Sequence, residues 1–262
     1  MERSKFETII DSVCLPIIIY VGMSLCVSVI YYLIKSLFPA DFLDDVNALM
    51  QQGIANLLLI FILVPHYASF KKKYNVTVGR VGAKLSLYII PLAFSLCIVC
   101  NIFLQYVPGA ADNEVTREVY EIIERYNIVL SLIIVSILAP VVEELIFRGF
   151  MYDGIASIYG AAPAIIFTSL VFAIIHFNLV QFIYAFIVGI FLGYVKYTYK
   201  SLKYTIFMHL LMNFCSLIFV PPILTLNDVR GMIFIEFICA VILILTIYRI
   251  HILNREIDKV DY

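Results

Sequence analysis

The sequence is poor in charge. Only 14% of its 262 residues are Asp, Glu, Lys or Arg, whereas 63% are hydrophobic, a composition far from that of soluble globular proteins. The formal net charge is -1, so the chain has no basic surplus of the kind that binds nucleic acid. This composition indicates a polytopic membrane protein, and we expect membrane lipids rather than nucleic acid around it.

The sequence also lacks a soluble domain, an internal repeat and a low-complexity linker. We therefore predict a single membrane domain over residues 1–262. All six cysteines fall inside apolar stretches. Cys97 and Cys100 form a C-x-x-C pair, but a metal or redox site of this type usually has further ligands or a known context. We expect these two thiols to be small apolar core residues, and we predict no disulfides.

Apolar stretches of about 20 residues predict transmembrane helices. The fold class that follows is all-α, a polytopic membrane helical bundle of about eight transmembrane helices. The predicted spans are 9–37, 48–70, 85–107, 128–149, 161–177, 179–197, 204–220 and 232–248. Asp153, beyond the fourth span, and the turn residues Gly160 and Pro163 indicate that the fourth helix continues past Gly149 and then turns back.

Lys and Arg residues are unevenly placed between the spans. With a cytoplasmic N-terminus, the inner segments collect most of them, including the run from Lys71 to Lys73. This distribution follows the positive-inside rule. We therefore expect a multi-pass protein of the cell membrane with both termini in the cytoplasm.

The fourth span contains adjacent glutamates and an arginine, and ionised groups at membrane depth are costly and usually functional. Glu144 and Arg148 are four residues apart with the acid first, the favourable order for a helical ion pair. Glu143 lies about 100° around the helix from Glu144. The spacing predicts that Glu144 and Arg148 neutralise each other and that Glu143 is the carboxylate left to act. A purely structural charge cluster is the alternative.

Two further spans carry polar residues at helical spacing. The fifth contains Phe172 and His176, and the seventh contains His209 and Asn213, each pair four residues apart and so on one helix face. A single histidine in an apolar helix is more often a packing residue than a ligand. Two histidines, an asparagine and a glutamate favour a shared site, because unpaired polar groups in hydrocarbon are costly and can satisfy one another.

Two chemistries fit this set of residues. A carboxylate beside neutral imidazoles can take a proton from water and generate a nucleophile, while an asparagine amide stabilises the developing oxyanion. Alternatively, Glu143, His176 and His209 could bind a divalent metal such as zinc with an open position for water. The spacing alone leaves both open, and either would hydrolyse an amide bond at the membrane.

Together the motifs Glu143-Glu144-x-x-x-Arg148, Phe172-x-x-x-His176 and His209-x-x-x-Asn213 resemble those of the CAAX-protease and bacteriocin-processing family of intramembrane proteases, also called the abortive-infection family. The resemblance covers about residues 131–219, which would be the catalytic core. It implies that Glu143 is the general base on water, that His176 and His209 aid proton transfer or coordination, and that Asn213 stabilises the oxyanion. Glu144, Arg148 and Phe172 would be supporting residues.

The resemblance also sets the expected function. We expect an intramembrane endopeptidase, bacterial in origin, that cuts a membrane-associated peptide or membrane-anchored protein. Family members are often described as metalloproteases, although a metal-free glutamate mechanism is proposed for the eukaryotic relative, so both cofactor states are carried forward. The alternatives are a non-enzymatic membrane scaffold or bacteriocin-immunity protein and, less favoured because no inverted repeat is evident, a transporter.

Overall fold

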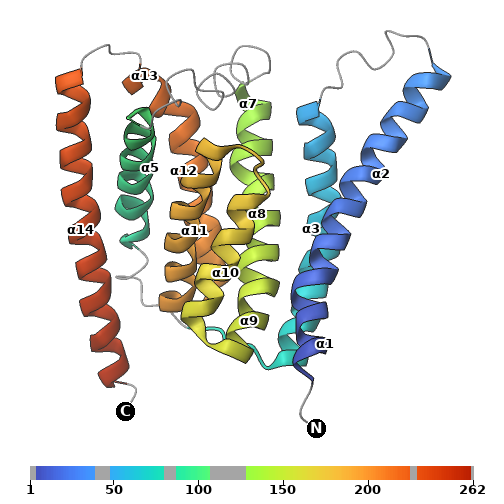
Figure 1. Cartoon of the computed structure of the whole chain (residues 1–262), viewed down its shortest axis with the longest axis horizontal. Helices are drawn as coiled ribbons and strands as arrows, with labels where there is room; N and C mark the ends of the chain where they lie inside the picture. Colours follow the sequence, from blue (N-terminus) through green and yellow to red (C-terminus); the bar gives the residue numbers. More distant parts are fainter. Residues whose placement is uncertain (1–3, 39–47, 80–86, 107–127, 225–228, 261–262) are drawn as a thin grey trace. The chain divides into compact units, whose positions relative to one another are not determined.

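The computed structural model describes residues 4–38, 48–79, 87–106, 128–224 and 229–260, and within these ranges every regular element is a helix (Figure 1). The all-α prediction is confirmed. The chain divides into two compact units. Unit 1 comprises residues 1–77 and 129–168, and unit 2 comprises residues 78–128 and 169–262. Each unit is described by itself below, and the prediction of one membrane domain stays a prediction.

Unit 1 is built from long helices of apolar sequence. Its first rod runs without a break from Lys5 to Leu37, and is made of α1 (Lys5–Ile9), the π-helical segment η1 (Ile10–Cys14) and α2 (Leu15–Leu37). The second is α3 (Ala48–Tyr74). The third runs from Ile128 to Tyr159, and is made of α7 (Ile128–Ser131), η2 (Leu132–Leu138), α8 (Ala139–Glu144), η3 (Leu145–Met151) and α9 (Tyr152–Tyr159).

Glycines fix how α3 packs against the third rod. A Cβ atom on Gly53 would lie 2.7 Å from Ile134 Cδ1, and a Cβ atom on Gly149 would lie 3.2 Å from the Tyr67 ring. The two contacts show that α3 and the third rod run in the same direction. Because Gly53 has no side chain, Ile134 can pack directly onto the backbone of α3.

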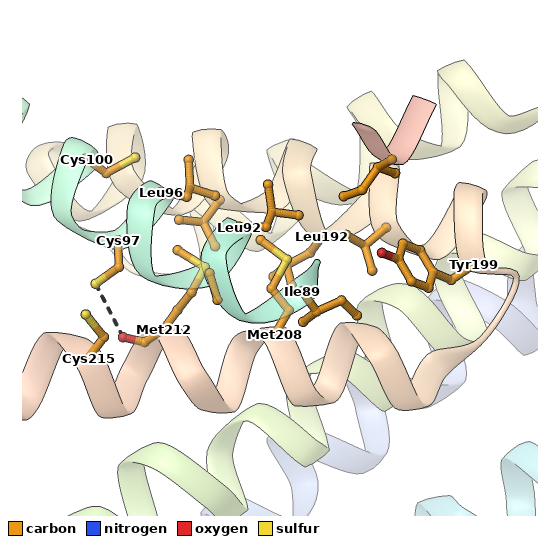
Figure 2. Close-up of a cluster of buried hydrophobic side chains, with 14 of the residues drawn as sticks. Ile89, Leu92, Leu96, Cys97, Cys100, Leu192, Tyr199, Met208, Met212 and Cys215 are labelled. Carbon is orange, nitrogen blue, oxygen red and sulfur yellow. Dashed lines mark hydrogen bonds between the residues drawn. The ribbon is translucent and has the colours of Figure 1, made fainter. Parts of the chain in front are cut away.

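Unit 2 has a well-packed apolar core (Figure 2). Its helices are the last part of α10 (Ala161–Ile174), then α11 (Leu179–Tyr199), α12 (Leu202–Ile218), α13 (Val220–Leu224), α14 (Val229–Val260) and, earlier in the chain, α5 (Ile89–Gln105). Leu92 and Leu96 of α5 meet Leu192 of α11 and Met212 of α12 in this core. The helix that carries His209 and Asn213, α12, is therefore held by close apolar packing.

The cysteines of the C-x-x-C pair lie in the same core. Cys97 and Cys100 are buried, and the Cys97 thiol donates a hydrogen bond to the Met212 carbonyl at 3.5 Å (Figure 2). All six cysteines are present as free thiols. The prediction that Cys97 and Cys100 are apolar core residues is confirmed.

The predicted spans agree with the structure in part. Five described helices are long and apolar enough to cross a membrane, and three shorter apolar helices accompany them, Ile89–Gln105, Ala161–Ile174 and Leu202–Ile218. Several apolar helices fit a multi-pass membrane protein, while the count of about eight spans stays a prediction. The third rod, which is the fourth predicted span, does continue past Gly149, as expected, and ends at Tyr159 before Gly160, which adopts φ +86°.

Several helix boundaries differ from the predicted spans, and two of the differences have a visible reason. The fifth span was predicted to end at Phe177, but α10 ends at Ile174 because the last amides bond three residues back, as in a 3₁₀ turn, and Phe177 takes a left-handed φ of +52°. The last helix was predicted over 232–248, but α14 runs from Val229 to Val260. Its polar C-terminal part continues the helix beyond the apolar stretch that sequence hydropathy detects.

Candidate active site

The buried ion pair lies in the third rod of unit 1. Arg148 Nη1 donates a hydrogen bond to Glu144 Oε1 at 2.9 Å, and both side chains are 0% exposed. The guanidinium also lies 5.9 Å from the centroid of the Phe147 ring. The prediction that Glu144 and Arg148 form an i,i+4 pair is confirmed, and this pairing compensates part of the cost of burying both charges.

Glu143 occupies a different environment from its neighbour. It is half-buried, whereas Glu144 is fully buried. Its carboxylate lies within electrostatic range of Arg148 and of the Tyr20 hydroxyl on α2. Glu143 is therefore the more accessible of the two carboxylates in unit 1, as the helical spacing predicted.

The helical segment that carries both glutamates is bracketed by wide turns. The six residues of α8 lie between the π-helical segments η2 and η3, each of seven residues. Pro140, near the start of α8, lacks an N–H and its ring crowds the carbonyl four residues earlier. A π turn relieves that crowding by shifting the hydrogen bonds to i→i+5, and such turns are frequent at functional sites.

In unit 2, His176 is fixed by a backbone carbonyl. It lies just beyond the end of α10, and its Nδ1 is 2.8 Å from the Phe172 carbonyl oxygen. A carbonyl can only accept, so Nδ1 must carry the proton and donate. In the neutral ring this leaves Nε2 as the lone-pair nitrogen, able to accept a proton or bind a metal.

Phe172 links the two histidines of unit 2. Its ring is 5.0 Å from the His176 ring and 5.8 Å from the His209 ring, edge-to-face in both cases, with interplanar angles of 84° and 88°. Phe172 is 2% exposed and His209 is 4% exposed. One turn along α12, Asn213 is half-buried. Unit 2 thus brings His176 and His209 into contact with one buried phenyl ring.

The predicted site residues are therefore divided between the units. Glu143, Glu144 and Arg148 belong to unit 1, whereas His176, His209 and Asn213 belong to unit 2. The joint action of the glutamate with the histidines is a proposal and not an observed contact. Sequence reasoning missed the π turns around α8, although Pro140 beside the glutamates was the available signal.

The described side chains give no support for a metal centre. Within the described ranges, no three residues among His, Cys, Asp and Glu are gathered so that they could hold one metal ion. The alternative in which Glu143, His176 and His209 bind zinc stays a prediction, to be tested in solution.

The described helices are apolar enough to fit a membrane protein. Several of them also bury ionisable or imidazole side chains. Residues 125–215, about a third of the 262-residue chain, match the family model Rce1-like, described as type II CAAX prenyl endopeptidase Rce1-like. The match supports the resemblance to the CAAX-protease family that the motifs carry. No curated protein and no solved structure matches the chain.

The matched segment contains every residue of the three motifs, from Glu143 to Asn213. The matched model describes a family of endopeptidases, and endopeptidases act on peptide or protein substrates. The match ends at residue 215, slightly before the predicted limit of the catalytic core at residue 219.

Proposed function

We propose that the chain is an intramembrane endopeptidase in which Glu143 activates water against a peptide bond of a membrane-associated peptide or protein. The observation that carries this proposal is that two adjacent carboxylates differ in pairing and in burial. Glu144 is committed to Arg148 at 2.9 Å with both side chains fully buried, whereas the neighbouring Glu143 is half-buried. The family match supplies the reaction class.

In the proposed reaction the carboxylate of Glu143 takes a proton from water as the water oxygen bonds to the carbonyl carbon. The amide of Asn213 donates to the oxyanion that forms, a contribution of about 3 kcal/mol at similar sites. Collapse of this intermediate breaks the C–N bond, and a proton reaches the leaving amine. His176, through Nε2, and His209 assist these proton transfers.

The supporting residues have positioning roles in this proposal. Glu144 and Arg148 form an ion pair between α8 and η3, and they take no part in bond cleavage. Phe172 holds both imidazole rings, and its carbonyl sets the tautomer of His176. The cytoplasmic placement of both termini and a bacterial cell membrane remain part of the proposal.

The test is cleavage of a membrane-peptide library by purified protein in lipid. We expect wild type to cleave and folded Glu143→Gln to lose cleavage, because glutamine preserves volume but cannot take the proton. Glu236→Gln, the same change at a half-buried glutamate of α14, is the control and should cleave as wild type does.

A chelator arm separates the two chemistries that the residues allow. Cleavage that survives chelation supports the glutamate mechanism, and cleavage that is lost and then restored by zinc supports a metal site. A Glu143→Gln variant that retained full activity would contradict the proposal and favour a scaffold or immunity role.

A further inference from the structure

Four of the six cysteines are buried in unit 2. Cys97 and Cys100 come from α5, Cys215 from α12 and Cys239 from α14. Cys215 lies within electrostatic range of both Cys97 and Cys239, so the fold gathers thiols that are more than a hundred residues apart in the sequence. The chemistry open to such a group depends on which sulfur atoms are in contact.

The direct contact is between Cys97 and Cys215. Both residues are 0% exposed, their thiols are hydrogen-bonded to each other, and Figure 2 shows the two sulfur atoms pointing toward one another. The Met212 carbonyl oxygen lies 3.5 Å from the Cys97 sulfur, and Met212 precedes Cys215 by less than one helical turn. The Cys97 side chain is therefore held against one short stretch of α12.

The C-x-x-C pair offers no comparable contact. Cys97 and Cys100 lie three residues apart within α5, and residues at this spacing have their Cβ atoms about 5–6 Å apart. A disulfide requires Cβ atoms about 3.5–4.5 Å apart, so a bond between these two would distort the helix. Among the described residues, Cys239 interacts with Cys215 electrostatically and without a hydrogen bond. The pair placed for bond formation is thus Cys97 with Cys215.

Polar groups surround the Cys97 sulfur inside this apolar core. The Tyr184 hydroxyl of α11 donates to it. Asn101 Nδ2, which donates to the Cys97 carbonyl, also lies 3.5 Å from the sulfur. Such N–H and O–H donors stabilise negative charge on sulfur, and the thiolate is the form of cysteine that reacts with oxidants. The surroundings of Cys97 therefore favour reaction of its sulfur.

We propose that Cys97 and Cys215 form a redox site, which a peroxide oxidises reversibly to a disulfide between α5 and α12. One sulfur attacks the O–O bond of hydrogen peroxide and becomes a sulfenic acid, and its thiol proton leaves with the displaced hydroxide as water. The other sulfur displaces hydroxide from the sulfenic sulfur, and its proton completes a second water molecule. The two sulfur atoms lose two electrons, and the O–O bond gains them.

The disulfide would act on the part of α12 that carries the motif residues. Non-bonded atoms stay about 3.5–4 Å apart, whereas disulfide sulfurs are about 2.05 Å apart, so bond formation draws Cys215 toward α5. Asn213 lies two residues and His209 six residues before Cys215. A misplacement of about 1 Å in an active site can cost about 100-fold in rate. This effect on cleavage rests on the proposed function, whereas the disulfide does not.

Peptide mapping tests the disulfide without any need for cleavage. The full chain in lipid vesicles is treated with hydrogen peroxide, the remaining thiols are blocked with N-ethylmaleimide, and linked peptides are identified by mass spectrometry. We expect Cys97–Cys215 to be the main intramolecular link and dithiothreitol to remove it. Absence of this link, or a faster link from Cys97 to Cys100 or from Cys215 to Cys239, would overturn the proposal.

Two matched variants each remove one buried thiol from the same core. Cys100→Ala should form the link at the wild-type rate, and peroxide should raise its melting temperature as in wild type, because a cross-link restricts the unfolded chain. Folded Cys215→Ala should show neither change. A peroxide-dependent rise in the melting temperature of Cys215→Ala would overturn the assignment to this pair.

Cleavage rates then separate regulation from bond formation. Fully linked wild type should lose cleavage several-fold and regain it with dithiothreitol, while Cys215→Ala should keep its own rate after peroxide. Unchanged cleavage by fully linked protein would overturn the effect on the reaction and leave the redox site. Absence of cleavage by reduced wild type would count against the proposed function only, since peptide mapping does not depend on it.

Discussion

The buried motif residues of unit 1 form an ion pair, whereas the motif histidines of unit 2 are held by one hydrogen bond and by aromatic contacts. In unit 1, Arg148 and Glu144 compensate each other at 2.9 Å. In unit 2, His176 is held by the Phe172 carbonyl and His209 by the Phe172 ring. Burying a charge is costly unless it is paired, and losing one hydrogen bond of a neutral group costs less than leaving a charge unpaired. The two regions should therefore respond differently to the loss of one partner.

The ion pair should be the more fragile of the two. Arg148→Met leaves Glu144 buried beside no cation of its own, and we expect a loss of about 3–5 kcal/mol in the free energy of unfolding. The double variant Glu144→Gln with Arg148→Met removes both charges and should recover most of that loss. Denaturant titration in detergent measures both. A double variant as unstable as Arg148→Met would show that packing, and not the unpaired charge, is responsible.

Substitution of His176 should lower the free energy of unfolding less than Arg148→Met does. His176→Gln lacks a nitrogen at the δ position, so the bond to the Phe172 carbonyl disappears at a cost of about 0.5–1.5 kcal/mol. His176→Asn places an amide N–H near the same position and should unfold as wild type does. Neither variant has the imidazole Nε2, so both should cleave poorly.

Thermal melting and cleavage assays distinguish the two roles of His176. If His176→Asn cleaved as well as wild type, the hydrogen bond to Phe172 would be its whole contribution and proton transfer would be excluded. Equal melting of the Asn and Gln variants would contradict the tautomer assignment.

The ion pair at the end of unit 1 should contribute least to the free energy of unfolding. Lys73 of α3 pairs with Asp11 of η1, and their side chains are 41% and 24% exposed. Exposed pairs contribute about 0.2–1 kcal/mol, and the Tyr74 hydroxyl still donates to Asp11 at 2.7 Å. Lys73→Met should therefore lower stability by no more than about 1 kcal/mol.

Salt dependence checks this last prediction. The difference between wild type and Lys73→Met should shrink as ionic strength rises, because salt screens exposed charges. Lys72→Met, which changes the neighbouring lysine, is the control. A loss several times larger for Lys73→Met, unaffected by salt, would show that the pair is as buried as Glu144 with Arg148.

Local spacing was the part of the site that the sequence predicted well. The four-residue interval predicted the Glu144–Arg148 pair and the contact of Phe172 with His176, since one helical turn decides both. The Phe172–His209 contact depends on how α10 and α12 pack, which no spacing within one helix encodes.

Helix irregularities were harder to predict from hydropathy. The end of α10 at Ile174 depends on a change of hydrogen-bond register and on the φ of Phe177, neither of which changes the apolar pattern. The π turns around α8 are likewise invisible to a periodicity of 3.6 residues, although Pro140 gives a local reason for one.

In the proposed mechanism, the carboxylate of unit 1 and the imidazoles of unit 2 serve one reaction. A double-mutant cycle on kcat/KM tests it most directly, with Glu143→Asp and His209→Gln chosen because each should leave residual activity. Groups that act in the same step are strongly non-additive. If they do act together, the double variant should lose much less activity than the product of the two single losses. A double loss equal to that product would contradict it, because the two groups would then act independently.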